Sequence, residues 1–107
     1  MILILIRARV EAEHRHELVQ MFKDTSQPNQ LPAACLEMRV YEEARSPDNL
    51  LLIEQWSDEA AMNSYLSSDQ FRALLGAVKV LGKLVDVRIF EAKSIQGLVM
   101  RLKVEEC

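Results

Sequence analysis

Residues 50–56 read Leu-Leu-Leu-Ile-Glu-Gln-Trp, and the rest of the predicted fold is built around this stretch. Successive side chains of a β-strand point to opposite faces, and the first four positions here are all apolar, so both faces carry apolar side chains. A strand of this kind lies inside a sheet whose two faces are both covered. Ser57-Asp58-Glu59 follows directly, with a hydroxyl that can cap a helix and two acids suited to the positive end of its dipole. The sequence therefore predicts a central strand that leads straight into a helix.

Three other stretches have the pattern of strands. Residues 2–6 are apolar at every position, which predicts a second doubly covered strand beside residues 50–56. Residues 36–41 alternate apolar and polar side chains, which predicts an edge strand, and residues 85–90 alternate in the same way. The turn-forming sequence Ser46-Pro47-Asp48-Asn49 predicts that the edge strand and the central strand form an antiparallel hairpin.

The segments between these strands have the apolar periodicity of helices. A first helix is expected from about residue 13 to about residue 25, and a short second helix carries Ala60, Met62, Tyr65 and Leu66 near one face. Ser67-Ser68-Asp69 then caps a third helix. Its apolar stripe, at i, i+3, i+4 and i+7, comprises Phe71, Leu74, Leu75 and Val78. Gly82 is expected to end this helix as a left-handed residue.

The resulting order is strand, helix, strand, strand, helix, strand, which is the split βαβ arrangement of ferredoxin-like α+β folds. It predicts a four-stranded antiparallel sheet with all helices on one face. We expect a single domain over residues 1–107, with a core at about 1–90 and a C-terminal extension at 91–107. The pattern of the extension fits either a strand or a helix.

Covering the second face of the sheet requires another layer. The strands at 2–6 and 50–56 would otherwise leave about five or six Leu or Ile side chains in water. Each would forgo roughly 1.5–3 kcal/mol of burial free energy. Such an apolar surface is typical of an interface, and an identical sheet related by a two-fold axis is the simplest cover. We therefore expect a homodimer. The alternative is that the C-terminal extension folds across this face.

Composition excludes several classes of function. The net charge is −3, with 50 % hydrophobic and 27 % charged residues, so the chain has no basic surface for nucleic acid. The first six residues are too short an apolar run for a membrane span or a signal peptide, so no membrane association is expected. Cys35 and Cys107 fit no metal-ligand spacing and are expected to be reduced thiols in a cytoplasmic protein.

Two motifs resemble the antibiotic biosynthesis monooxygenase (ABM) family. They are Glu54-Gln55-Trp56-Ser57-Asp58-Glu59-Ala60-Ala61, in which Glu54 and Trp56 have the spacing of the family's E-x-W pattern, and the segment from Tyr65 to Phe71. The Pro32 to Cys35 segment and the Ser46-Pro47-Asp48 turn also match the family's pattern, so the resemblance covers about residues 1–90. It implies a dimer whose two sheets form an α+β barrel, and a cavity between sheet and helices in each subunit.

The resemblance also implies an activity. Some members oxidise polycyclic phenols with dioxygen and no cofactor, so we expect a cofactor-independent monooxygenase that acts on a small aromatic quinol or phenol. A non-catalytic module of the same fold, which binds a small ligand or a partner, is the alternative. Haem-degrading members use an asparagine, a tryptophan and a histidine where this chain has Arg7, Tyr65 and Leu75. Without an axial histidine, haem degradation is not expected, and no metal site is predicted.

Candidate site residues follow from these patterns. Tyr65 either satisfies its hydroxyl on a backbone carbonyl or donates to a developing phenolate, and Arg7 supplies positive charge. Trp56 is either a core residue or, with Phe71, an aromatic wall for a planar ligand. Met62 and Phe22 are further candidate substrate-binding residues. No general base is identified from the sequence.

Glu54 needs a partner as a charged residue on a covered strand. An arginine on a neighbouring strand is expected to form an ion pair with it, and the candidates are Arg7, Arg39 and Arg88.

Overall fold

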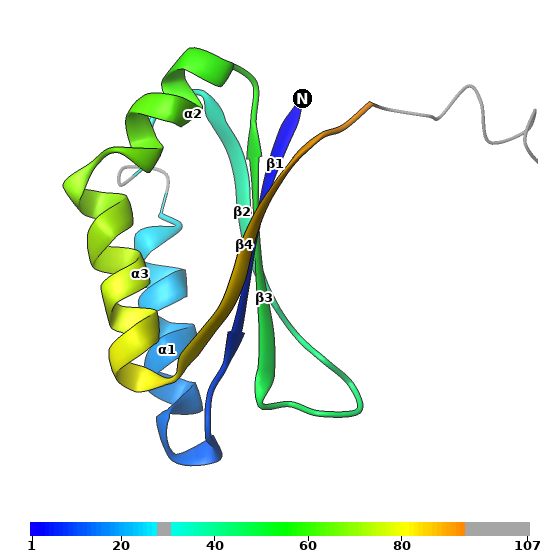
Figure 1. The fold of residues 1–107 in the computed structure, drawn as a ribbon, viewed down its shortest axis with the longest axis vertical. Helices are drawn as coiled ribbons and strands as arrows, with labels where there is room; N and C mark the ends of the chain where they lie inside the picture. The colour runs from blue at the N-terminus through cyan, green and yellow to red at the C-terminus, as the bar shows by residue number, and fades with distance from the viewer. Residues whose placement is uncertain (28–30, 94–107) are drawn as a thin grey trace, which may run out of the picture.

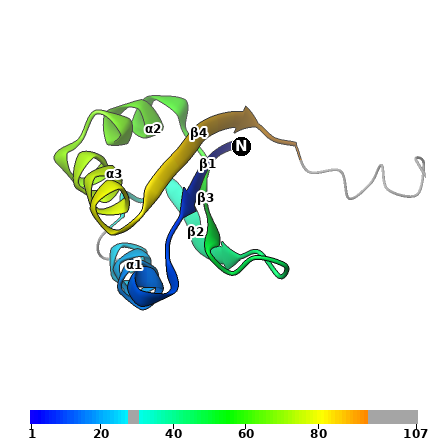
Figure 2. The ribbon, with the colours of Figure 1, turned by 60° about the horizontal axis from the view of Figure 1, so that its bottom comes forward.

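The computed structural model describes residues 1–27 and 31–93. Its elements in chain order are β1 (Ile2–Arg9), α1 (Ala12–Thr25), β2 (Cys35–Glu42), β3 (Asn49–Trp56), α2 (Glu59–Leu66), α3 (Asp69–Leu81) and β4 (Lys83–Glu91). The four strands form one antiparallel sheet in the order β2-β3-β1-β4. Figures 1 and 2 show all three helices on one side of this sheet. The predicted ferredoxin-like α+β fold is confirmed, with β1 and β3 at the centre and β2 at an edge.

The central strand β3 divides its side chains between two environments. Leu50, Leu52, Glu54 and Trp56 are buried under the helices, and we call this side of the sheet the helix face. Leu51, Ile53 and Gln55 are only partly buried on the opposite side, which we call the open face. β1 follows the same rule, with Ile4 and Ile6 on the helix face and Leu3 and Leu5 on the open face. Both strands are therefore apolar on both faces, as predicted.

Helices α2 and α3 begin at side chains that cap them, whereas α1 begins after Glu11 without a side-chain cap. Asp58 Oδ2 accepts a hydrogen bond of 3.0 Å from the Ala61 amide at the start of α2. Ser68 Oγ accepts one of 3.2 Å from the Phe71 amide at the start of α3, as predicted. The hydroxyl of Ser57 does not cap α2. It donates instead to the Ala34 carbonyl, which joins the end of β3 to the residue before β2.

Gly82 ends α3 in a different way from the one predicted. Its φ of −161° is extended and not left-handed, so backbone conformation does not require glycine there. The close approach of neighbouring backbone does require glycine. A Cβ at this position would lie 3.2 Å from Val10 Cα and Cβ and far inside contact distance of the Arg9 carbonyl oxygen. The missing side chain lets the α3–β4 connection pass against the end of β1.

The open face carries the apolar side chains that the sequence predicts. Leu3, Leu5, Leu51 and Ile53 form its centre, and Phe90 of β4, which pairs with Leu3, is 44 % exposed. No described element covers them. The alternative cover by the C-terminal extension concerns residues that lie almost entirely outside the described part of the chain.

Candidate active site

Glu54 is fully buried on the helix face of β3 and is the one charged residue among the described residues that is buried. The Trp56 indole Nε1 donates to its Oε1 at 3.1 Å, and the Tyr65 hydroxyl donates to its Oε2 at a longer 3.5 Å. Glu54 and Trp56 share a face because they are two apart on a strand. Tyr65 reaches them from α2, which folds back over this end of the sheet (Figure 1).

Three aromatic rings pack in series, and the first two of them, Trp56 and Tyr65, donate hydrogen bonds to this carboxylate. The Trp56 and Tyr65 ring centroids lie 4.8 Å apart, and those of Tyr65 and Phe71 lie 5.2 Å apart. Both separations are typical of favourable aromatic contacts. We call Glu54, Trp56, Tyr65 and Phe71 the carboxylate–aromatic cluster. The convergence of the three rings was predicted, and the predicted alternative of a backbone carbonyl as partner of Tyr65 is wrong, because its hydroxyl donates to Glu54.

The predicted ion pair of Glu54 with an arginine is also wrong. Arg7 binds Asp86 through two hydrogen bonds of 2.9 and 2.5 Å, and Arg88 lies 3.3 Å from the same carboxylate. Arg39 pairs with Glu37 on its own strand. Strand parity explains the error, since these residues belong to the open face and Glu54 to the helix face. The carboxylate therefore has hydrogen-bond donors but no countercharge on any described residue.

This environment changes the acid–base behaviour of the site. Burial raises the pKa of Glu54 from an ordinary 4.5 to about 7, because desolvation outweighs the two donated hydrogen bonds, which act in the opposite direction. Burial and the nearby carboxylate also raise the pKa of Cys35 to about 11 and that of Tyr65 well above its usual range. The thiol and the phenol therefore stay protonated at neutral pH, and Glu54 is the group of the three that can gain or lose a proton there.

The raised pKa of Glu54 predicts a pH-dependent stability. Between about pH 4.5 and about pH 7 the unfolded chain has lost this proton while the folded chain still holds it. The free energy of unfolding is therefore expected to fall as pH rises through this window, by at most about 1.4 kcal/mol per pH unit. Urea denaturation over this pH range should show the fall in the wild type but not in Glu54→Gln.

Glu91→Gln is the matched control, since Glu91 is an exposed carboxylate at the end of β4. It should leave the pH dependence of the wild type in place. A pH dependence that survives in Glu54→Gln would show that the Glu54 carboxylate is not held neutral by the fold.

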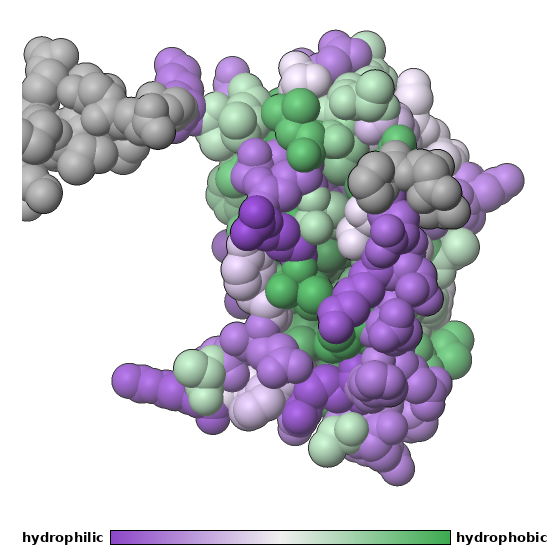
Figure 3. Space-filling model, turned by 180° about the vertical axis from the view of Figure 1, so that it is seen from behind, coloured by the Kyte–Doolittle hydropathy of each residue, from purple (hydrophilic) through white to green (hydrophobic). Residues whose placement is uncertain are grey.

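A groove between α1 and β2 lies beside the cluster. It has a volume of about 400 Å³, and its lining combines apolar with polar side chains: Phe22, Met38, Val40 and Leu52 with Lys23, Ser26, Arg39 and Tyr41. Figure 3 shows hydrophobic side chains at the bottom of this hollow and hydrophilic surface around it. A smaller pocket of about 190 Å³, which Cys35 lines, shares Met38 with the groove. We call the larger one the α1/β2 groove.

The other predicted site residues lie in different parts of the structure. Phe22 lines the α1/β2 groove, and Met62 is buried in the core on α2. Trp56, Tyr65 and Phe71 are buried and packed against one another, and they line neither the α1/β2 groove nor the pocket beside Cys35. Arg7 lies on the open face, on the far side of the sheet from Tyr65. The structure therefore does not bring together the two residues that were predicted to be catalytic.

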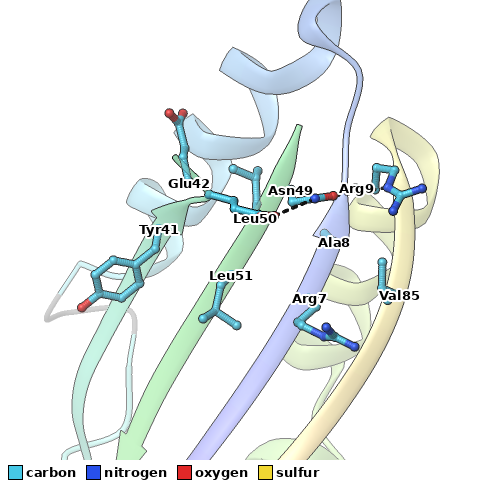
Figure 4. A pocket seen from close by; sticks show the side chains of 10 residues that line it. Arg7, Ala8, Arg9, Tyr41, Glu42, Asn49, Leu50, Leu51 and Val85 are labelled. Carbon is cyan, nitrogen blue, oxygen red and sulfur yellow. Dashed lines mark hydrogen bonds between the residues drawn. The ribbon is translucent and has the colours of Figure 1, made fainter. Parts of the chain in front are cut away.

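Arg7 instead belongs to a second pocket, of about 370 Å³, on the open face. Figure 4 shows its side chain on the same side of the strands as those of Tyr41, Leu51 and Val85. Arg9 at the edge of this pocket donates to the Asn49 side chain at 3.2 Å. Val85 reaches the open face because the pairing of β1 with β4 is shifted by a bulge at this point.

Two features of the site were missed by sequence reasoning. The first is Glu54 as an uncompensated carboxylate bonded to Trp56 and Tyr65, for which the i, i+2 spacing of Glu54 and Trp56 was an available signal. The second is the α1/β2 groove, which depends on the distance between a helix and an edge strand and has no signal in the sequence.

The sequence of the chain matches a known protein family. The sequence profile described as "Antibiotic biosynthesis monooxygenase" matches residues 1–76, which include β3, the cluster and most of α3. The chain belongs to the ABM family. No curated protein matches this ABM chain.

Solved structures share the fold of this ABM domain. A candidate antibiotic biosynthesis monooxygenase from Deinococcus radiodurans is 25 % identical, with a TM-score of 0.76 over 88 % of this chain and 94 % of that one. A conserved protein from Methanosarcina mazei is 21 % identical, with a TM-score of 0.73 over 86 % and 92 % of the two chains. SnoaB from Streptomyces nogalater, a cofactor-independent oxygenase, is 17 % identical, with a TM-score of 0.73 over 87 % and 93 %.

The described part of this ABM chain has two further properties that bear on function. It contains no helix that is long and apolar enough to cross a membrane. Within residues 1–27 and 31–93, no three His, Cys, Asp or Glu side chains are grouped so that they could hold a metal ion.

Proposed function

We propose that the chain is a cofactor-independent monooxygenase that oxidises a small aromatic quinol or phenol with dioxygen, between the sheet and the helices. The observation that carries the proposal is the carboxylate–aromatic cluster, in which the fully buried Glu54 accepts hydrogen bonds from Trp56 and Tyr65, and Tyr65 packs against Phe71. Family membership and the likeness to the Deinococcus radiodurans protein support the reaction class. That SnoaB is a cofactor-independent oxygenase agrees with it.

The chemistry of the cluster suits this reaction. Aromatic walls favour a planar ligand, and a water-poor site strengthens each polar contact made inside it. An aromatic substrate reacts with dioxygen more readily after its hydroxyl is deprotonated, because the phenolate is richer in electrons. In our proposal the Tyr65 hydroxyl, now bonded to Glu54, donates to the oxygen of that phenolate. Because the cluster is packed, the substrate displaces side chains as it enters, and Trp56 and Phe71 then contact its ring.

Oxygen consumption tests the proposed activity directly. Wild-type protein is expected to consume dioxygen with at least one member of a panel of hydroquinones, anthrones and flavonoids. Tyr65→Phe should keep the fold and lose about 0.5–1.5 kcal/mol of stabilisation, a roughly two- to tenfold lower kcat/KM. A ligand that binds without any oxygen consumption would instead favour the non-catalytic binding module.

We also propose that the chain acts as a homodimer through its open face. The apolar centre of this face, formed by Leu3, Leu5, Leu51 and Ile53, supports a sheet-to-sheet contact with a second copy. The flanking Arg7–Asp86 ion pair and the Gln55–Glu37 hydrogen bond of 2.9 Å give this centre a polar rim. This pattern is typical of a specific interface and differs from a scattered set of exposed apolar residues.

Leu5→Lys should separate the two subunits without unfolding them. The substitution places an unpaired charge in the contact while the lysine can still reach water in the monomer. Val80→Lys is the matched control, because Val80 is 83 % exposed on α3. Size exclusion with light scattering is expected to show a dimer for the wild type and Val80→Lys, and a monomer for Leu5→Lys. A monomeric wild type at micromolar concentration would rule out the dimer.

A further inference from the structure

Met38 links the α1/β2 groove to Glu54, because it lines the groove and lies next to Glu54 in the sheet. Met38 is the cross-strand partner of Glu54 in the pairing of β2 with β3, so the two side chains are neighbours on the helix face. Met38 also lines both the groove and the smaller pocket beside Cys35. A methionine is unbranched and flexible, so its side chain can change rotamer without movement of the backbone.

The described groups around Glu54 supply hydrogen bonds but no positive charge. Its other cross-strand partner is the fully buried Ile4, and the buried residues of α1 and α3 beneath the sheet are all apolar. The titratable groups that act on it are Cys35 on β2 and Tyr65 on α2, which both remain neutral at neutral pH. No described cation pairs with it. A buried carboxylate with hydrogen-bond donors, no countercharge and a cavity next to its cross-strand neighbour is a candidate for proton transfer.

We propose that Glu54 is the general base of this site and takes the hydroxyl proton of a phenolic ligand that enters through the α1/β2 groove past Met38. The inference deepens the proposed function and rests on it. In the step, the O–H bond of the ligand breaks and an O–H bond forms on the Glu54 carboxylate, which leaves a phenolate and a neutral carboxylic acid. No electrons are transferred at this stage. The near-neutral pKa of Glu54 is what such a base requires at cellular pH.

Two phenolic probes test the step without any need for turnover. For 2-naphthol, the wild type is expected to gain affinity by about tenfold per pH unit as pH rises toward the pKa of Glu54, because only the carboxylate form accepts the proton. Glu54→Gln should bind more weakly, with no pH dependence in this range. Glu91→Gln, the control, should behave as the wild type. For 4-nitrophenol, the bound probe should show the visible phenolate band with the wild type and the neutral spectrum with Glu54→Gln.

Several results would overturn the proposal. These are an absence of binding by both probes, an affinity for 2-naphthol that ignores pH in the wild type, and a neutral spectrum of bound 4-nitrophenol in both proteins. Met38→Ala should associate faster with 2-naphthol, and association at the wild-type rate would remove the groove as the route. If the probes behave as expected but no member of the panel consumes dioxygen, Glu54 remains a base and the oxygenase function fails.

Discussion

Leu52→Asp is expected to abolish the folded state. Leu52 is 1 % exposed at the centre of β3, between Val40 of β2 and Ile6 of β1 on the helix face. An aspartate there would bury a carboxylate without a partner, at a cost of several kcal/mol. The whole stability of a domain of this size is about 5–15 kcal/mol. Circular dichroism and thermal denaturation measure the loss.

Leu51→Asp is the matched control for this experiment. It makes the same substitution one residue away, on the open face, where the side chain is only partly buried. The variant should keep its secondary structure and lose the ability to dimerise. A Leu52→Asp protein with an unchanged melting temperature would show that β3 is not the centre of the core.

Gly82→Ala is expected to destabilise the protein by about 1–3 kcal/mol, the usual range for forcing additional atoms into a packed site. The added Cβ would clash with the backbone of Arg9 and Val10. Backbone atoms cannot relieve a clash by a rotamer change, as the end of a flexible side chain can. Because β1 is a central strand, the shift would spread into the sheet. Chemical denaturation gives the change in the free energy of unfolding.

Gly76→Ala makes the same change within α3, where nothing lies within 4 Å of the added Cβ. It should stabilise the protein by about 0.5–1 kcal/mol, because alanine favours a helix more than glycine does. Opposite signs at the two glycines would support the close approach at Gly82. Equal effects would contradict it.

The fold was predictable because its signals are local. The apolar runs of β1 and β3, the alternation of β2 and the stripe of α3 each correspond to an element of the structure. These runs do not show how each strand is oriented. A strand that is apolar on both faces does not reveal which face lies under the helices. That ambiguity allowed Arg7 to be placed near Tyr65 and an arginine near Glu54, and both expectations failed together.

The candidate site was predictable only where a single element or adjacent elements define it. Trp56, Tyr65 and Phe71 follow one another from β3 through α2 into α3, and they do converge. The bonding of Glu54 and the position of Met38 opposite it depend on the register between strands, which is shifted by an irregularity between Cys35 and Glu37. No local pattern encodes such a shift.

We expect Glu54 to titrate near neutral pH while it is in contact with Trp56. Trp56 is the only tryptophan in the chain, and its indole N–H donates to Glu54, so its fluorescence reports on the charge of that carboxylate. A pH titration of the emission is expected to show an inflection near pH 7 in the wild type and in Glu91→Gln, and none there in Glu54→Gln. An emission that stays constant through neutral pH in the wild type, or an inflection that persists in Glu54→Gln, would contradict this expectation.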